Sequence, residues 1–257
     1  MFKVISARIR QGYRTAPFPD KEMKMPERYL GLPAIDGSKC VSDCRKCVDS
    51  CPVSCINKTE KGISIDLGTC IFCGNCAKEC PSEAIAFSKN YSVATRKRDD
   101  LVIEGGTFKL AEELDKEMKS LFGRSLKLRE VSAGGCNACE ADTNVLNTLA
   151  WDLGRFGIQF VASPRHADGL LITGTVTPNM VLALKKTYDA VAYPKIVIAV
   201  GACAISGGIY KGIPGENNGA APIVPVDLYI PGCPPHPATI LDGLLRLLGR
   251  IKGASKN

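Results

Sequence analysis

The chain has 257 residues, enough for one small and one larger domain, and its mixed composition with a net charge of +7 is that of a globular protein. No apolar run approaches the roughly eighteen residues that span a bilayer, and residues 1–12 contain no apolar stretch long enough for a secretory signal. We therefore expect a cytoplasmic, reducing location, where thirteen cysteines more often bind metal than form disulfides.

Residues 1–35 are predicted to form a basic arm, because Lys and Arg outnumber Asp and Glu there. One interpretation is a solvated, partly unstructured segment. The alternatives are contact with an anionic membrane surface or with an acidic redox partner. Nucleic acid is excluded as the expected partner, because the arm has neither a binding motif nor a series of stacking aromatic residues.

Residues 36–100 contain a cysteine motif that occurs twice. The second copy (Cys70, Cys73, Cys76 and Cys80-Pro81) has the C-x2-C-x2-C-x3-C-P spacing of bacterial ferredoxins, which binds 4Fe-4S clusters. In the first copy, Cys44, Cys47 and Cys51 each precede their counterparts by 29 residues, whereas Cys40 precedes Cys70 by 30. In such repeats the last cysteine of each copy binds the other cluster. We therefore predict two cluster-binding sets: Cys40, Cys44, Cys47 and Cys80 for the first cluster, and Cys51, Cys70, Cys73 and Cys76 for the second.

The inserted residue between Cys40 and Cys44 makes Cys40 the least secure ligand. Cys55 corresponds to Ala84 in the second copy, which favours a small buried side chain at this position. The alternative is that Cys55 replaces Cys40. Short strands are expected at 62–66 and 84–88.

Residues 101–125 are predicted to be a linker with a connector helix over 108–122. Leu110, Leu114, Met118 and Leu121 fall on one face of that helix, and Gly123 would end it. We expect this helix to pack on a domain.

In the predicted C-terminal domain, residues 126–257, apolar strands alternate with helices. Strands are expected at 126–131, 158–162, 170–173, 195–200 and 227–230, and helices at 142–156, 180–191 and 238–251. This alternation favours a parallel, flavodoxin-like α/β sheet that is covered on both faces.

Four cysteines follow strands of this sheet. Cys136 and Cys139 come after the first strand, and Cys203 and Cys233 each follow a later strand by three residues. All four would lie at the carboxyl edge, where open α/β sheets bind ligands. The set predicts a third 4Fe-4S cluster. Structural zinc is the alternative, although zinc ligands usually come in two close pairs.

The motifs resemble those of known families. Residues 1–100, with the lead-in 25–31 and the run 51–56, resemble the two-cluster subunit of complex I and its hydrogenase relatives. The motifs at 135–140, 163–168, 174–180, 201–208 and 231–237 look like the small subunit of energy-converting nickel–iron hydrogenases and the homologous subunit of complex I. The pair Cys136-x-x-Cys139 is typical of the hydrogenases, because the complex I subunit has adjacent cysteines there. Ala138 departs from the hydrogenase pattern, which favours glycine.

This resemblance implies an electron-relay subunit of a membrane-bound nickel–iron hydrogenase. Three 4Fe-4S clusters would connect an external donor, expected to be ferredoxin, with the nickel–iron site of a catalytic large subunit. Membrane-arm subunits would be further partners, and the complex would lie on the inner face of the cell membrane. The alternatives are the equivalent subunit of a complex-I-like quinone or nickel-free oxidoreductase, and a zinc-stapled assembly protein without redox activity.

Few other residues carry chemistry. The resemblance makes Glu140 a proton-conducting carboxylate at the large-subunit interface, whereas a plain structural role is an acid near a helix N-terminus. His166 and His236 are expected to pack at the surface or an interface, and Trp151 in the core or at the subunit interface. No nucleotide loop and no nucleophile–histidine–acid arrangement is apparent. The catalytic metal site is therefore expected on another chain.

Overall fold

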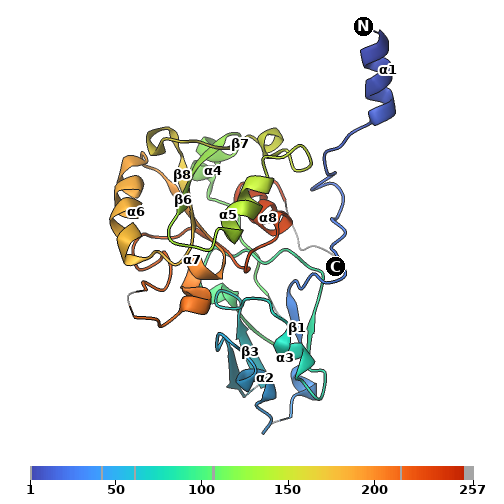
Figure 1. Cartoon of the computed structure of the whole chain (residues 1–257), viewed down its shortest axis with the longest axis vertical. Coiled ribbons are helices and arrows are strands. Elements are labelled where there is room, and N and C mark those ends of the chain that lie inside the picture. The colour runs from blue at the N-terminus through green and yellow to red at the C-terminus, as the bar shows by residue number, and fades with distance from the viewer. Residues whose placement is uncertain (1, 42, 61, 106–107, 215, 252–257) are drawn as a thin grey trace.

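A computed structural model of the chain describes residues 2–41, 43–60, 62–105, 108–214 and 216–251. The end of the predicted C-terminal domain, 252–257, lies outside these residues. A larger region is built on a parallel sheet, a smaller region carries two antiparallel sheets, and the helix α1 projects away from both (Figure 1). Within the described ranges, no helix has the length and apolar character needed to cross a membrane.

The elements of the first half are short. They are α1 (Phe2–Gln11), β1 (Pro33–Ile35), η1 (Gly37–Lys39), α2 (Lys46–Asp49), β2 (Ile56–Thr59), β3 (Gly62–Asp66), α3 (Asn75–Lys78), β4 (Ile85–Phe87), η2 (Asp99–Leu101), β5 (Val102–Glu104) and α4 (Lys116–Phe122). The second half contains β6 (Leu126–Ser132), α5 (Ala138–Val145), η3 (Leu153–Phe156), β7 (Ile158–Phe160), η4 (Pro164–His166), β8 (Gly169–Thr173), α6 (Pro178–Ala190), β9 (Ile196–Val200), α7 (Ala202–Ser206), η5 (Gly208–Tyr210), β10 (Leu228–Ile230) and α8 (Pro237–Leu247).

The predicted flavodoxin-like sheet is confirmed. Its strands pair in parallel in the order β10-β9-β8-β6-β7, which is the doubly wound order 2-1-3-4-5 read from the other edge. Every residue of β8 and β9 is buried, as expected for parallel strands covered on both faces. Side chains of the sheet pack against helices on both of its faces. Leu128 and Ile198 pack with α8 on one face, whereas Ile172 packs with α6 on the other.

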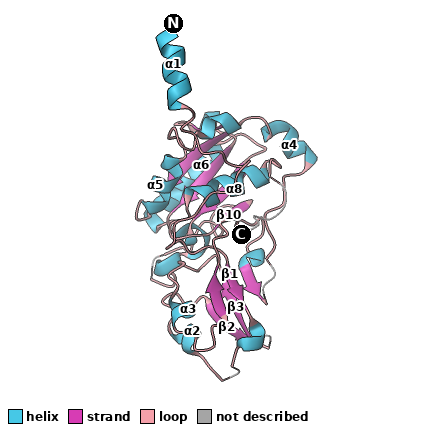
Figure 2. Cartoon of the chain, turned by 90° about the vertical axis from the view of Figure 1, so that its right-hand side faces the viewer, coloured by secondary structure: helices cyan, strands magenta, loops and turns pink. Residues whose placement is uncertain are grey.

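The α+β ferredoxin-like fold of the smaller region is also confirmed. β1 pairs antiparallel with β4, and β2, β3 and β5 form a second antiparallel sheet. The short helices α2 and α3, which carry Cys47 and Cys76, lie beside the antiparallel strands of this region (Figures 1 and 2). The exact domain boundaries stay a prediction.

The two regions share a hydrophobic core. Ile65 and Leu101 of the smaller region belong to the same buried cluster as Ile205 and Tyr229 of the larger one. Thr95, in the connection between the regions, exchanges two backbone hydrogen bonds with Tyr229 on the outer edge of β10, at 3.0 and 2.8 Å. Because apolar burial and sheet pairing both cross the seam, the two regions hold a fixed relative position.

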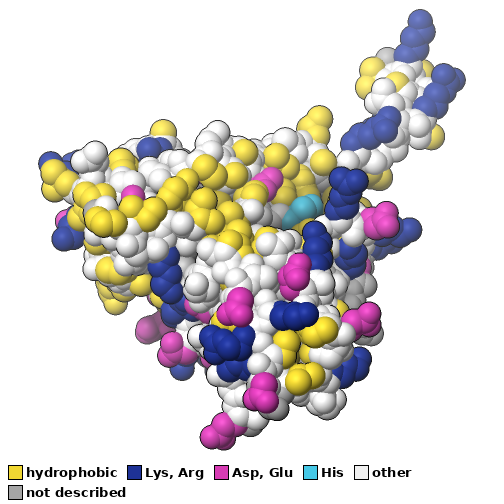
Figure 3. All heavy atoms as spheres, turned by 60° about the horizontal axis from the view of Figure 1, so that its bottom comes forward, with side chains coloured by type: hydrophobic (Ala, Val, Ile, Leu, Met, Phe, Trp, Pro, Cys, Tyr) yellow, Lys and Arg dark blue, Asp and Glu magenta, His cyan; other side chains and the backbone are white. Residues whose placement is uncertain are grey.

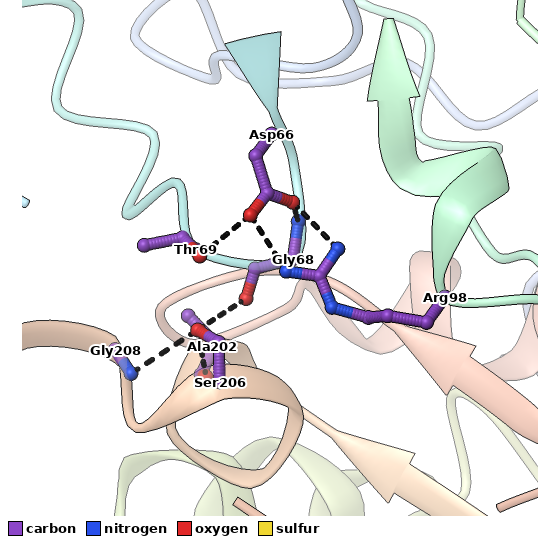
Figure 4. A network of polar contacts seen from close by, with 7 residues as sticks. All are labelled: Asp66, Gly68, Thr69, Arg98, Ala202, Ser206 and Gly208. Carbon is purple, nitrogen blue, oxygen red and sulfur yellow. Dashed lines mark hydrogen bonds and ion pairs between the residues drawn. The ribbon is translucent and has the colours of Figure 1, made fainter. Parts of the chain in front are cut away.

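A polar network crosses the same seam (Figure 4). The Arg98 guanidinium donates to both oxygens of Asp66 at 2.7 and 2.6 Å, and Thr69 Oγ1 donates to Asp66 at 2.7 Å. Burial alone would raise the pKa of Asp66, but these hydrogen bonds outweigh it and hold the pKa below its ordinary value. Ser206 Oγ on α7 donates to the Gly68 carbonyl oxygen at 2.9 Å. The loop that leads into Cys70 is thereby tied to the helix that carries Cys203.

The predicted connector helix over 108–122 is mostly wrong. Only α4 is helical, beginning after Asp115, whose carboxylate accepts a hydrogen bond from Met118 N at 2.9 Å. The preceding residues form no regular element. Ala111 N donates to Ala94 O at 2.8 Å, and Leu114 N donates to Leu247 O at 2.9 Å. Leu121, expected on the buried face, is 57% exposed. Tertiary hydrogen bonds here override a helical pattern of apolar residues.

The predicted helix over 142–156 is shorter and displaced. α5 begins at Ala138 and ends at Val145, and η3 follows only after Asp152, which adopts a left-handed φ of 48°. Burying Leu146, Trp151 and Leu153 needs this interruption, because an unbroken helix could not turn all three inward. The helix expected over 238–251 is α8, which ends at Leu247 just before Gly249 at φ +67°.

The basic arm is partly ordered. α1 is a helix with no buried residue, and it stands clear of the body with Lys and Arg side chains along it (Figure 3). Further on, the arm is attached: Phe18 is buried, and Arg155 donates to the carbonyl oxygens of Ala16 and Phe18 at 2.9 and 2.8 Å. The expected solvated arm is therefore found only at α1, and the residues around Phe18 are attached to the body of the protein.

Arg246→Met should destabilise the fold strongly. Arg246 Nε lies 2.7 Å from Asp242 Oδ2, and both side chains are at most 4% exposed. Removing the cation leaves a buried carboxylate without its partner, which costs about 3–5 kcal/mol. Urea unfolding followed by circular dichroism measures the change. Arg45→Met, which removes an exposed pair with Asp49, should cost under about 1 kcal/mol. Equal effects of the two substitutions would contradict the argument.

Candidate metal centres

The first cysteine set, Cys40, Cys44, Cys47 and Cys80, lines one cavity. Its wall is completed by apolar side chains, among them Ile63 and Ile85. Three of the cysteines come from the first copy of the motif and one from the second. The pKa of the Cys47 thiol is raised by burial and then by the charges of Cys80, Cys40 and Cys44.

The second cysteine set, Cys51, Cys70, Cys73 and Cys76, lines another cavity with Ile56, Ile65 and Phe87. Here one cysteine comes from the first copy and three from the second. Burial, followed by the charges of Cys70, Cys73 and Cys51, raises the pKa of Cys76 to about 12. In both cavities, the sulfurs are close enough for each negative charge to oppose the others.

Backbone amides point at the sulfurs of these sets. Cys55 N lies 3.4 Å from Cys51 Sγ, and Ala84 N lies 3.3 Å from Cys80 Sγ. The two corners are repeats of each other, since Ser54 and Glu83 before these amides have nearly equal left-handed φ values of 49° and 50°. Hydrogen bonds to sulfur favour the thiolate. They hold the pKa of Cys80 below its ordinary value against the opposing effect of burial.

Cys55 lies in the second cavity and away from Cys40. Its Sγ is 3.5 Å from Cys51 Sγ, and Cys70 lines the same cavity, where contact with Cys55 is the largest cause that lowers the pKa of the Cys70 thiol. Contact with Cys55 is the largest cause that lowers the pKa of Cys51, to about 5. The side chain is 4% exposed, so the predicted buried position of Cys55 is confirmed.

The third cysteine set is Cys136, Cys139, Cys203 and Cys233. Cys139 lies in α5 and Cys203 in α7, while Cys136 and Cys233 lie in the loops that follow β6 and β10. Burial raises the pKa of the Cys139 thiol, and the charges of Cys203, Cys233 and Cys136 raise it further. The carboxyl edge of the sheet therefore brings the four together, with Cys136 and Cys233 exposed at the surface.

Glycines make room for these sulfurs. A Cβ on Gly201, whose φ is +90°, would lie 2.5 Å from Cys139 Sγ, and a Cβ on Gly208 would lie 3.1 Å from Cys203 Sγ. Only glycine allows the backbone to approach so closely. Four converging cysteine sulfurs in each set, with amides and glycines around them, suit a cationic group bound through thiolates. The residues present thus fit iron–sulfur clusters.

Glu140 is buried beside the third set. Its Oε1 accepts hydrogen bonds from Ser132 Oγ at 2.6 Å and from Thr173 Oγ1 at 2.8 Å. It is 6% exposed, so the carboxylate lies inside the molecule and not at a solvated helix end.

Glu130 on β6 is a second acidic residue in this area, and sequence reasoning missed it. Burial, and then the charge of Glu140, raise the pKa of Glu130 to about 7, and its Oε1 is buried without a hydrogen-bond partner. The sequence did contain an indication of this position. Glu130 is two residues beyond Leu128 and four beyond Leu126, so its side chain is on the same face of β6 as these two buried leucines.

The two histidines have different roles. His236 Nδ1 accepts a hydrogen bond from Ala238 N at 3.1 Å and so caps α8, while its ring packs edge-on against Tyr29 and Trp151. Burial lowers the pKa of His236. His166 is exposed in η4. Trp151 is buried in the core, which agrees with one of its two predicted places.

Two family models match the chain. Residues 136–247 match "NADH ubiquinone oxidoreductase, 20 Kd subunit", and residues 39–84 match "4Fe-4S dicluster domain". The two matches cover the third cysteine set and the first two, respectively.

Three curated relatives show the similarity. The chain is 40% identical to "Probable membrane-bound hydrogenase subunit mbhJ" of Pyrococcus furiosus, over 54% of this chain and 86% of that protein. It is 43% identical to an NADH-quinone oxidoreductase subunit of Phocaeicola vulgatus, over 58% of this chain and 74% of that protein. It is also 45% identical to "Formate hydrogenlyase subunit 7" of Escherichia coli, over 50% of this chain and 51% of that protein.

Three observations indicate the same family: the order of the motifs, the parallel sheet with cysteines at its carboxyl edge, and these similarities. The chain belongs to the 20 kDa subunit family of NADH ubiquinone oxidoreductase and its hydrogenase relatives, carries a 4Fe-4S dicluster domain in its N-terminal region, and has 4Fe-4S clusters as its cofactors.

Proposed function

We propose that this chain is the electron-transfer subunit of a membrane-bound, energy-converting nickel–iron hydrogenase. It connects an external donor, ferredoxin, with the nickel–iron site of a partner large subunit. The observation that carries the proposal is the presence of three four-cysteine sets in one chain whose relatives include a membrane-bound hydrogenase subunit and a formate hydrogenlyase subunit. When bound, a 4Fe-4S cluster takes up and releases single electrons.

Each set is proposed to hold one cluster through its four thiolates. The first and second sets line separate cavities, and the third set surrounds the carboxyl edge of the sheet. The fold also brings the second set towards the third, since the charge of Cys70 contributes to the raised pKa of Cys233. The hydrogen bond from Ser206 to Gly68 braces this approach.

The partner large subunit is proposed to cover the third set. Gly134, Gly135, Cys136 and Asn137 are exposed in one continuous loop, and Cys233 is exposed beside them in the fold. A site whose ligands open to the surface needs a neighbour to exclude water from it. We place the complex on the inner face of the cell membrane, with membrane-arm subunits as further partners. The basis is the relatives' names and α1, a basic amphipathic helix with exposed Phe2, Val4, Ile5 and Ile9.

A complex-I-like quinone oxidoreductase is the second candidate, and the similarity to the NADH-quinone oxidoreductase protein of Phocaeicola vulgatus favours it. The spacing of Cys136 and Cys139 favours the hydrogenase instead. The purified complex separates the two. A hydrogenase contains nickel and produces hydrogen from reduced ferredoxin, whereas the alternative lacks nickel and reduces a quinone.

Anaerobically purified chain should contain about twelve irons with matching acid-labile sulfide, because three 4Fe-4S clusters are expected. Cys233→Ala should lower the iron content by about a third and remove one paramagnetic signal after dithionite reduction. Cys55→Ala, a cysteine outside the three sets, should keep all the iron. A colourless protein, or one with zinc in place of iron, would end the proposal.

Gly201→Ala should disrupt the third set alone. The added methyl would meet Cys139 Sγ at 2.5 Å, so the thiolate must move and the cluster held there should be lost. Gly212→Ala is the matched control, because Gly212 has a similar φ of +80° but nothing within 4 Å of the added Cβ. Iron per chain and the reduced spectrum measure the difference. Normal iron in Gly201→Ala would contradict this assignment.

Glu140 is proposed to conduct protons at the large-subunit interface. Glu140→Gln keeps the shape of the side chain but removes its proton-carrying carboxylate. Hydrogen production by the complex should fall at least about tenfold. The spectra of the reduced clusters should stay unchanged. Full activity of the variant would show that the carboxylate is only structural.

A further inference from the structure

We propose that the Cys55 thiol donates a hydrogen bond to the coordinating sulfurs of the second cysteine set and so raises the reduction potential of the cluster held there. Cys55 is then a positioning residue that acts through Cys51 and Cys70. This inference rests on the proposed function, because it presumes a cluster at the second set.

The geometry places Cys55 beside the sulfurs of one set. Its Sγ is 3.5 Å from Cys51 Sγ, its backbone N–H is directed at the same sulfur, and Cys70 lines the same cavity. The side chain is almost fully buried in the cavity of the second set. Asp66 N donates to the Cys55 carbonyl oxygen at 2.9 Å, which fixes the backbone at the start of β2.

The direction of the hydrogen bond follows from coordination chemistry. A cysteine that binds iron does so as a thiolate, so Cys51 and Cys70 carry no proton once the cluster is bound. The only S–H among the three sulfurs then belongs to Cys55. A 4Fe-4S cluster is complete with four thiolates, and the second set supplies four without Cys55. The fifth thiol can therefore act as donor.

The repeat provides an internal comparison. Ala84 occupies the position of Cys55 in the other corner: its N–H is directed at Cys80 Sγ at 3.3 Å, and it is 3% exposed. The two corners have similar backbone conformations and differ in one group: Cys55 carries a thiol on its Cβ where Ala84 carries a hydrogen. The first set has polar neighbours of its own, including Lys58 Nζ at 3.5 Å from Cys40 Sγ. The inference therefore concerns the second set alone.

The effect on potential follows from charge. Reduction adds one electron, and so one negative charge, to the cluster and its sulfurs. A hydrogen-bond donor in a water-poor cavity stabilises that charge more than a methyl group does. Removing the donor should make the cluster harder to reduce, which moves its midpoint potential to a more negative value.

The test is a dithionite titration of the complete chain, purified without oxygen and followed by electron paramagnetic resonance. Cys55→Ala, which copies the residue of the other corner, should move one midpoint to a more negative value, leave the others in place and keep all the iron. Cys55→Ser retains a donor, so its midpoint should lie positive of that of Cys55→Ala. Ala84→Cys adds a thiol beside Cys80 and should move the midpoint of the other dicluster site to a more positive value.

Three results would overturn the inference. These are unchanged midpoints in Cys55→Ala, equal midpoints in Cys55→Ala and Cys55→Ser, and loss of about four irons in Cys55→Ala, which would make Cys55 a ligand. Failure of the proposed function is distinguishable from all of these. A chain without clusters would contain no iron before any substitution, and a quinone-reducing complex would lack nickel while the Cys55 variants still shifted one midpoint.

Discussion

Repulsion between crowded thiolates is the constraint on which this structure depends. Cys76 and Cys139 each have three other cysteines among the groups that raise their pKa. As thiolates, such sets are unfavourable without nearby positive charge. The fold supplies directed amides and close glycines, and the proposed clusters would supply the positive charge. In the smaller region, tight turns direct backbone amides at the sulfurs. In the larger region, the sulfurs gather at the carboxyl ends of parallel strands.

The parts closest to the chemistry were the most predictable from the sequence. The spacing in the two motif copies anticipated that Cys80 would join the first cavity and Cys51 the second, as the cavity linings have it. All five strands of the parallel sheet also begin within one residue of their predicted starts, because they are short apolar runs between turns. In these places local pattern and tertiary contacts favour the same structure.

Other features depended on contacts that no local pattern reveals. The apolar pattern before α4 predicts a helix. Hydrogen bonds from Ala111 and Leu114 to distant carbonyl groups instead keep this segment out of a helix. The break after α5 depends on burying Trp151 and Leu153. The proximity of Cys55 to Cys70 could not be inferred either, because it depends on how the two copies of the motif pack together.

The pairing of Thr95 with Tyr229 has a consequence for solubility. β10 is the last strand of the parallel sheet, and its outer side would otherwise present unpaired N–H and C=O groups. Exposed edges of this kind recruit strands from other molecules and lead to aggregation. By pairing with that edge at Thr95, the chain between the two regions blocks it against such recruitment.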